Sequence, residues 1–539
     1  MGMPSTGTGE RSPSLGRPTA QQGTPDRPAA RAWHRLRCVV GSWRDWAAMA
    51  REHWLLTAFL AVGLVLRVLT QVAYQPAILY IDSIKYLLGD YPGNDPPGYN
   101  FALKPILLAG NLGVVAALQH LLGLAMAVTL YAVLLRRGSP RWLAALAVAP
   151  VLLDGYQLQI EQNIMPDVMF ETLIVAGLAF LLWDTRPRLG LTAAGGFALG
   201  SSATARQIGE IFIVPALLFV LVTVTGGWRL RLKHAATLCV AFAVPVLLAS
   251  YVNYVGISPH RFSHFSLAPY ASGSVYGRAA AAADCATLVL PSYERPLCPT
   301  PWQQHQGPDW LDHMAGSPVK KFTSSGHMGS VFARHVLEQQ PLRVAAAIAK
   351  SALTLFAVDR NTSPGDTPIA RWQFQDSFIQ YPPYVTVQHG TIVFGEFSRH
   401  EQPVTTGTGA QFGSASPTVL RPLASFLRAY QLGGGYTPGP LLAFAAIAGL
   451  IGTALAIRRR RPAAERVTSQ ACLLFSTCAV AVLLASDFFE FSWRYQLPAL
   501  VTLPPAAALA ITLVVRMRGS QPSRGSASYG SADGEPAAQ

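Results

Sequence analysis

Residues 54–74 read WLLTAFLAVGLVLRVLTQVAY, an apolar run whose only charged side chain is Arg67. A helix needs about 20 mostly apolar residues to cross the hydrocarbon core of a bilayer, and this run supplies them. Comparable runs recur along the chain, so the sequence predicts ten transmembrane helices. They lie at Trp54–Tyr74, Leu112–Leu135, Trp142–Leu158, Val168–Trp183, Leu189–Ala205, Ile208–Val224, Ala235–Tyr254, Pro440–Ile457, Val467–Ser486 and Leu497–Val515.

The composition excludes a soluble protein. The 539 residues are 51% hydrophobic and 13% charged, whereas soluble proteins carry about 25% charged residues. Several soluble domains of this total length would lack the charges to cover their surfaces, and the high apolar content also excludes a disordered chain. The net charge of +14 does not indicate nucleic-acid binding, because the basic residues lie beside the apolar runs and in the N-terminal tail.

The positions of the basic residues predict the orientation of the helices. Cytoplasmic loops of membrane proteins carry an excess of Lys and Arg. If the N-terminus is cytoplasmic, the short inner connections hold fifteen of these residues. The short outer connections then hold only four, which are Lys85, Lys104, Arg206 and Arg494. We therefore predict a multi-pass protein of the plasma membrane with both termini in the cytoplasm.

The predicted topology divides the chain into five parts. They are a disordered, basic and partly amphipathic cytoplasmic tail at 1–50, a catalytic core with spans 1–7 at 51–254, an extracytoplasmic domain at 255–439, spans 8–10 at 440–516 and a disordered cytoplasmic tail at 517–539. The fold class is thus an all-α polytopic membrane protein with an extracytoplasmic mixed domain inserted between spans 7 and 8. The apolar segment Val344–Val358 is short and contains Lys350, so we assign it to an interfacial or domain-core helix. Arg31–His53 fits either a helix on an anionic membrane surface or a basic flank that orients the first span.

Two of the six cysteines predict a disulfide. Cys285 and Cys298 lie 13 residues apart in the predicted extracytoplasmic domain, on the oxidising side of the membrane where disulfides form and persist. The other cysteines lie in or near helices or on the cytoplasmic side, so we assign them structural roles.

Ionisable residues gather on the predicted outer face. Asp82 and Tyr86 follow the first span and are four residues apart, so a helix would place them on one side. The second outer loop carries Glu161 and Asp167, and Glu171 lies about one turn into the next apolar run. An ionisable residue inside such a run is a functional hypothesis by default.

Three arginines accompany these acids. Arg67 lies in the outer half of the first span, Arg206 lies in the third outer connection, and Arg494 lies in the last one, followed by Tyr495. The planar guanidinium group of arginine binds phosphate through bidentate, charge-assisted hydrogen bonds. A membrane enzyme that uses a lipid phosphate needs such side chains at the level of the headgroups.

Each of these residues also has a purely structural explanation. Asp82 fits a solvated loop acid, Arg67 fits a side chain that extends to the lipid headgroups, and Asp167 fits a helix cap favoured by the N-terminal dipole. Glu490 and Arg494, four residues apart, fit a surface ion pair. Taken together, however, the three arginines lie on separate segments of the outer face, where cations are disfavoured. This pattern indicates an anion-binding site with carboxylates nearby.

The same residues resemble the ordered motifs of GT-C fold glycosyltransferases. These membrane enzymes use polyprenyl-phosphate sugars and include the protein O-mannosyltransferases and the aminoarabinose transferases of lipid A. The matching features, in order, are Arg67, Asp82 with Tyr86, the Pro96–Tyr99 re-entry, Asp167, the Thr204–Arg206 hairpin, and Arg494 with Tyr495 and Pro498. The resemblance covers about 54–260 and 440–516. This chain differs from the family at Asp82-Ser83, where many members have Asp-Glu. Its soluble part also lies between spans 7 and 8 rather than wholly at the C-terminus as in some branches, so no subfamily is assigned.

The resemblance implies an inverting hexosyl- or pentosyltransferase. It would move a sugar from a polyprenyl phosphate to an acceptor hydroxyl of a cell-envelope glycan, a lipid or a protein on the extracytoplasmic face. Asp82 is the expected catalytic base, and Arg206, Arg494 and Arg67 are the expected ligands of the donor phosphate. The residues expected to bind sugar or acceptor, or to support the site, are Tyr86, Glu161, Asp167, Glu171 and Tyr495.

The sequence assigns no metal site. Some members of the family use a divalent metal, so a divalent metal stays possible for this chain, but we expect no obligatory cofactor. His260 and His264 are four residues apart, yet no cluster of His, Cys and acidic residues has convincing ligand spacing.

Two other functions fit a polytopic chain. A transporter or lipid flippase also uses buried charges, but it tends to place them near the middle of the membrane in repeated halves. Here the polar groups lie at outer helix ends, and no internal repeat is visible. A non-catalytic assembly protein would leave the outer acids and arginines scattered. A structure that gathers Asp82, Asp167, Arg206 and Arg494 around one cavity would favour the enzyme.

Overall fold

The computed structural model describes residues 43–88, 95–256, 265–268, 275–322, 325–362, 367–377, 385–388, 391–394, 418–457 and 462–519. The chain divides into two compact units, 1–54 and 55–539. In the first unit, helix α2 spans Trp43–Glu52. The predictions made for residues 1–42, His260, His264 and 520–539 lie outside the described residues, as does Arg458–Arg461, a run counted among the fifteen inner basic residues.

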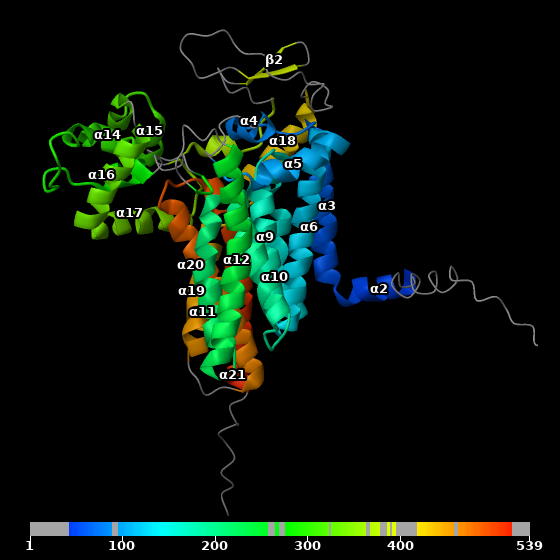
Figure 1. Ribbon diagram of the computed structural model, residues 1–539. Helices are drawn as coiled ribbons and strands as arrows, with labels where there is room; N and C mark the ends of the chain where they lie inside the picture. Colours follow the sequence, from blue (N-terminus) through cyan, green and yellow to red (C-terminus); the bar gives the residue numbers. More distant parts are fainter. Residues whose placement is uncertain are drawn as a thin grey trace, which may run out of the picture. The chain divides into compact units, whose positions relative to one another are not determined.

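Every predicted span coincides with helical structure in the second unit, as Figure 1 shows. The corresponding elements are α3 (Trp54–Ala73), α6 (Leu112–Arg136), α7 (Arg141–Leu153) with α8 (Gly155–Gln162), α9 (Asp167–Leu182), α10 (Leu189–Ala205), η1 (Gln207–Phe212) with α11 (Ile213–Thr223), α12 (Trp228–Gly256), α19 (Gly439–Ile457), α20 (Ala463–Asp487) and α21 (Pro498–Gly519). Among the described residues, five helices are long and apolar enough to cross a membrane by length and composition, or six if the bent pair α7–α8 counts as one span. The protein is therefore mostly helical with five or six candidate spans, and the ten-span topology stays a prediction.

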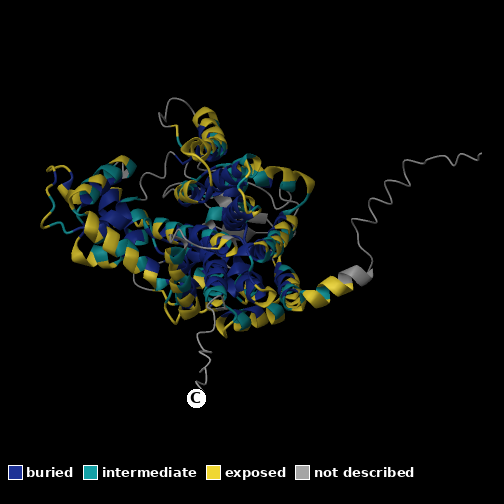
Figure 2. Cartoon of the chain, turned by 90° about the horizontal axis from the view of Figure 1, so that it is seen from below, coloured by how far each residue is buried: buried dark blue, intermediate teal, exposed yellow. Residues whose placement is uncertain are grey.

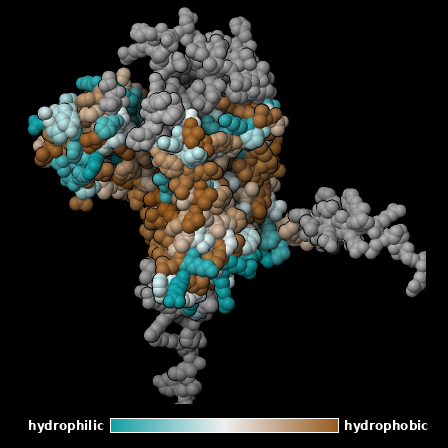
Figure 3. Space-filling view, in the orientation of Figure 1, coloured by the Kyte–Doolittle hydropathy of each residue, from teal (hydrophilic) through white to brown (hydrophobic). Residues whose placement is uncertain are grey.

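The outer surface of this bundle is apolar. Large hydrophobic side chains point outward from several helices, including Val65 and Val68 on α3, Leu248 on α12, and Phe444 and Ile447 on α19. Figure 3 shows the resulting hydrophobic surface along the helices, with hydrophilic residues at the lower end of the bundle. Soluble proteins rarely expose apolar patches of this extent, so this surface fits the interior of a bilayer.

The helices pack side by side around a buried interior (Figure 2). The most extensive contacts join α10 to α9 and α12, and α21 to α19 and α20. Shorter helices lie near one end of the bundle in Figure 1, namely α4 (Ile81–Leu88), α5 (Gly98–Ala109) and α18 (Arg421–Leu432). A two-stranded antiparallel sheet pairs β1 (Tyr74–Gln75) with β4 (Thr418–Val419).

The predicted span Trp142–Leu158 is not one straight helix. Helix α7 ends at Leu153, and α8 continues at an angle of 49°. Asp154 causes the break because its backbone is extended and its carboxylate accepts hydrogen bonds from the amides of Tyr156 and Thr437. All residues of α8 are buried, although half of them are polar or charged: Gln157, Gln159, Glu161 and Gln162.

The region between α12 and α18 contains a second hydrophobic core. It is built by α13 (Tyr276–Ala282), η3 (Arg295–Leu297), α15 (Gly307–His313), η4 (Pro318–Lys321), α16 (Ser325–Gln339) and α17 (Pro341–Thr354). Helix α14 (Pro301–His305) contacts α13 and α15. Most of the apolar segment Val344–Val358 lies in α17, whose 14 residues are too few for a span and which packs against α13 and α20. The same region holds η5 (Ile369–Trp372) and the antiparallel strands β2 (Val385–Gln388) and β3 (Thr391–Phe394).

Cys285 and Cys298 form a disulfide beside this second core. Among the described cysteines, Cys239, Cys472 and Cys478 are free thiols.

We expect this disulfide to be detectable by counting thiols. The chain has six cysteines, so denatured, unreduced protein should react with a polyethylene-glycol maleimide at four positions and reduced protein at six. A gel-shift assay distinguishes the two, and the C285S/C298S variant should show four with or without reductant. Six reactive thiols in protein kept from reductants would contradict the disulfide.

Candidate functional site

Four charged residues that are far apart in the sequence form one ionic cluster. Arg494 Nη1 lies 3.2 Å from Asp82 Oδ2, and Arg494 Nε lies 3.7 Å from Asp167 Oδ1. The guanidinium of Arg206 donates to the same oxygen of Asp167. We call Asp82, Asp167, Arg206 and Arg494 the ionic cluster. The alternative explanation of Glu490 and Arg494 as a surface ion pair does not describe Arg494, which is buried and contacts the two aspartates.

Helix ends bring the four residues of the ionic cluster together. Asp82 lies in the first turn of α4, and Asp167 is the first residue of α9, where the helix dipole stabilises a carboxylate. Arg206 directly follows α10, and Arg494 lies in η7 (Trp493–Gln496) just before α21. The cluster therefore lies where four elements begin or end.

A close backbone approach holds the Arg206 hairpin against the start of α5. A Cβ atom added at Gly98 would lie 2.6 Å from the carbonyl oxygen of Thr204, so only glycine allows this contact. The predicted re-entry at Pro96–Tyr99 and the Thr204–Arg206 hairpin thus pack directly on each other.

Aromatic rings lie against the two arginines of the ionic cluster. The ring of Tyr495 lies 4.5 Å from the guanidinium carbon of Arg206 and 4.8 Å from that of Arg494. Trp372 and Tyr80 also face Arg494, at 4.9 and 5.8 Å. Such cation–π contacts stabilise a charge that has left bulk water. Burial and the neighbouring Asp82 carboxylate raise the pKa of Tyr80, which keeps its hydroxyl protonated.

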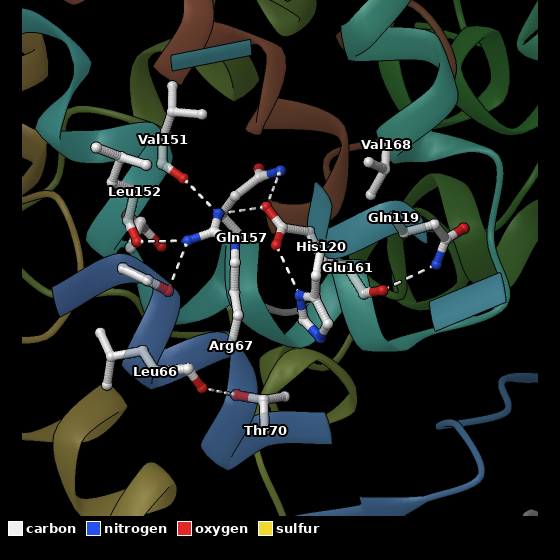
Figure 4. Close-up of polar contacts among 12 residues, drawn as sticks. Leu66, Arg67, Thr70, Gln119, His120, Val151, Leu152, Gln157, Glu161 and Val168 are labelled. Atoms are coloured by element: carbon white, nitrogen blue, oxygen red, sulfur yellow. Dashed lines mark hydrogen bonds and ion pairs between the residues drawn. The ribbon is translucent and has the colours of Figure 1, made fainter. Parts of the chain in front are cut away.

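Arg67 and Glu161 belong to a second, deeper network, shown in Figure 4. Arg67 Nη2 lies 2.7 Å from Glu161 Oε1, and the other Glu161 oxygen lies 2.8 Å from His120 Nδ1. The guanidinium of Arg67 also donates to the carbonyls of Gly63, Val151 and Leu152. The side chains of Arg67 and Glu161 are 2% and 0% exposed, so this network, which we call the buried network, lies inside the protein.

Helices α8 and α9 connect the buried network to the ionic cluster. Gln157 Nε2 donates to Glu171 Oε2 at 2.8 Å and lies 3.4 Å from Glu161 Oε1. Glu171 is fully buried on α9, four residues after Asp167. Tyr86 is also buried, with its ring against that of Tyr99. The structure thus gathers Asp82, Asp167, Arg206, Arg494 and Tyr495 in one place, whereas Arg67 pairs with Glu161 in the other network.

Basic residues occupy the opposite ends of the same helices. Arg137, directly after α6, donates to the carbonyl groups of Leu182, the last residue of α9, and of Asp184. Arg516, near the end of α21, donates to the carbonyl of Gly138. Since α9 and α21 start at the ionic cluster and end at these arginines, the two kinds of charge lie at opposite ends of the bundle.

Several functional candidates carry no recognisable signal in the sequence. Arg360 pairs with Asp154 at 3.3 Å and lies against the rings of Tyr156, Tyr436 and Trp493 at 4.4–5.2 Å. It lies in a region without recognisable motifs, as does Trp372. His120 and Gln157 both lie in predicted spans, and only their burial beside Glu161 distinguishes them.

Comparisons with known proteins agree with the resemblance seen in the sequence. Residues 84–259 match the family described as dolichyl-phosphate-mannose-protein mannosyltransferase. This region includes Tyr86, Asp167 and Arg206, so the resemblance to that glycosyltransferase family is confirmed here. No curated protein matches the chain.

The solved structures that the chain matches include an archaeal oligosaccharyltransferase and ArnT. The oligosaccharyltransferase of Archaeoglobus fulgidus, tethered to an acceptor peptide, is 12% identical with a TM-score of 0.39, over 86% of this chain and 50% of its own. The same enzyme with an inhibitory peptide and a dolichol-phosphate is 14% identical with a TM-score of 0.38, over 89% and 53%. ArnT from Cupriavidus metallidurans bound to undecaprenyl phosphate is 15% identical with a TM-score of 0.26, over 85% and 77%. The chain spans about half the length of the oligosaccharyltransferase.

Breaking the buried network should destabilise the protein strongly. R67M leaves Glu161 without its main counter-charge, and removing one partner of a buried ion pair costs about 3–5 kcal/mol. We expect a decrease of this size in the free energy of unfolding, measured by denaturant titration of the protein in mixed micelles.

An exposed pair supplies the control for this measurement. Arg334 and Glu338 form an ion pair on the surface of α16 with side chains 78% and 55% exposed, and such pairs contribute little to stability. R334M should therefore unfold like the wild type. Equal stability of R67M and R334M would show that the Arg67–Glu161 pair does not hold the bundle together.

Proposed function

We propose that this protein is an inverting membrane glycosyltransferase. It transfers a sugar from a polyprenyl-phosphate donor to an acceptor hydroxyl at the extracytoplasmic face of the plasma membrane, with ten spans and both termini in the cytoplasm. The match of residues 84–259 to a mannosyltransferase family supports the reaction class. The ends of the bundle support the orientation, because the ionic cluster lies opposite the arginine-rich end that the positive-inside rule assigns to the cytoplasm.

The observation that carries this proposal is the ionic cluster itself. Two arginines and two aspartates from four separate elements are in contact at one end of an apolar bundle. A non-catalytic assembly protein gives no reason for this contact. A lipid whose tail stays in the bilayer would present its phosphate at this level, so the cluster is placed to receive a lipid-linked anion.

The arginines act on the leaving group in the proposed reaction. The bond between the anomeric carbon and the phosphate oxygen breaks, and the polyprenyl phosphate departs with the bonding electrons. Arg206 and Arg494 stabilise that charge through charge-assisted hydrogen bonds. In the described part of the protein, Arg494 Nε and Asp167 Oδ2 have no hydrogen-bond partner, so the cluster retains bonding capacity for a ligand.

Asp82 acts as the general base. Its carboxylate accepts the proton of the acceptor hydroxyl while the hydroxyl oxygen attacks the anomeric carbon from the face opposite the phosphate, which inverts the configuration. The side chain of Asp82 is 21% exposed, whereas that of Asp167 is 3% exposed. An acceptor can therefore reach Asp82, and Asp167 instead fixes the positions of the two arginines.

An apolar cavity in the side of the bundle suits the polyprenyl chain. It has a volume of about 850 Å³, and its walls come from α7, α19, α21 and the segment after α18. Asp154 and Tyr436 lie at its lining, and both contact Arg360, which in turn faces Trp493 beside Arg494. The cavity is thus connected to the ionic cluster through one arginine and one aromatic ring.

The remaining predicted site residues support the cluster from inside. Arg67, Glu161 and Glu171 link α3, α8 and α9 through buried contacts, and Tyr86 packs the start of the site against α5. The ring of Tyr495 lies against both guanidinium groups of the ionic cluster and helps to hold them in place.

Replacing the base should abolish most of the activity. General-base assistance is typically worth about 10²–10⁴-fold, so D82N should lower kcat by that factor with unchanged expression. The assay uses purified protein with a panel of labelled polyprenyl-phosphate sugars. D184N serves as the control because Asp184 lies at the opposite end of α9 and pairs with exposed Arg188. Turnover by D82N equal to that of D184N would remove Asp82 from the mechanism.

Replacing a phosphate ligand should instead weaken donor binding. R206K keeps the charge but loses the planar fork, and hydrogen bonds to charged groups contribute about 1.5–3 kcal/mol. We expect kcat/KM for the donor to fall by about 10–100-fold, through a higher KM and, because Arg206 also stabilises the departing phosphate, a lower kcat. Competition by polyprenyl phosphate without sugar should weaken in parallel. An unchanged KM in R206K would show that the donor phosphate binds elsewhere.

A further inference from the structure

A group of three potential metal ligands lies next to the ionic cluster. One ligand atom from each of Asp309, His313 and Glu490 lies within 4.8 Å of the others. Asp309 and His313 are one helical turn apart on α15, and Asp309 Oδ1 lies 3.1 Å from His313 Nδ1. Glu490 comes from the segment between α20 and η7, 177 residues further along the chain.

The electrostatics of this group favour a bound cation. The carboxyl groups of Asp309 and Glu490 lie close together, with the imidazole of His313 against Asp309. Two carboxylates in contact repel unless a proton or a cation lies between them.

We propose that Asp309, His313 and Glu490 bind a divalent transition-metal ion such as Zn²⁺ or Mn²⁺. Binding displaces the proton that His313 holds beside Asp309, after which two carboxylates and a neutral imidazole balance the charge of such an ion. This mixture of oxygen and nitrogen donors suits zinc or manganese better than calcium or magnesium. Metal–ligand bonds of about 2.0–2.2 Å place neighbouring ligand atoms about 3–3.6 Å apart, so a small contraction of the group completes the site. The side chain of His313 is 60% exposed, which gives an ion a path from solvent.

The ion would join two parts of the protein. It ties α15, in the second hydrophobic core, to the segment that leads into Arg494 four residues after Glu490. The metal is thus a structural link that holds Arg494 in place, and it is separate from the proposed sugar transfer.

Metal binding to the full chain tests this inference. Protein purified through a tag without histidines is treated with EDTA, dialysed, and equilibrated with Zn²⁺, Mn²⁺, Mg²⁺ or Ca²⁺, and bound metal is measured by mass spectrometry. We expect one equivalent of Zn²⁺ or Mn²⁺. Loss of an outer-shell partner alone typically costs 10–100-fold in affinity, so D309N, H313Q and E490Q should each weaken binding by more than about 100-fold.

A second histidine–carboxylate pair in the same region supplies the control. His335 Nδ1 lies 2.7 Å from Glu294 Oε2, and H335Q should bind the metal like the wild type. Hydrogen–deuterium exchange of residues 488–494 should slow when metal is added to the wild type but not to E490Q, and circular dichroism verifies that each variant is folded. Binding of none of the four ions at one equivalent, or equal affinity in E490Q and wild type, would overturn the site. Because the binding measurement contains no sugar donor, failure of the proposed transferase activity leaves its result unaffected.

Discussion

The ion pair between Arg67 and Glu161 is the contact on which the arrangement of the bundle depends. Burying an unpaired charge among apolar helices is costly, so Arg67 on α3 can lie inside only where Glu161 on α8 meets it. His120 on α6 occupies the other carboxylate oxygen. A Cβ atom at Gly123 would overlap both the Glu161 carboxylate and the Arg67 guanidinium, which explains glycine at that position of α6. Three helices are thereby fixed in one register.

The contacts of the buried network determine where the residues of the ionic cluster lie. Glu161 is linked through Gln157 to Glu171, and Glu171 lies one turn after Asp167 at the start of α9. The position of Asp167 then sets where Arg206 and Arg494 can pair. The outer residues therefore meet because the helices that carry them are held together deeper in the bundle, and their own contacts are made at helix ends where small backbone changes are tolerated.

The sequence is sufficient to predict the helices but not all of the partners. A long apolar run predicts each helix, because every residue of the run contributes to the signal. No local pattern predicts the break at Asp154, because the carboxylate that caps α8 also accepts a hydrogen bond from the amide of Thr437, 283 residues away. Polarity assigns part of Gly155–Gln162 to an outer loop, yet the segment is a buried helix inside the bundle. Arg67 is predicted to bind phosphate because the sequence shows its type and depth but not its neighbour, and Arg360 and Trp372 lie outside every recognised pattern.

Arg494 has a particular place in the proposed chemistry because it contacts both Asp82 and Asp167. Before reaction, its charge is balanced by these carboxylates. When Asp82 takes the acceptor proton it becomes neutral, while the departing phosphate gains the negative charge that the broken bond leaves behind. The negative charge thus moves from one neighbour of Arg494 to another, and the guanidinium needs little displacement to follow it. Rings on several sides of Arg494, from Trp372, Tyr80 and Tyr495, restrict its motion, which keeps the positive charge where the new negative charge develops.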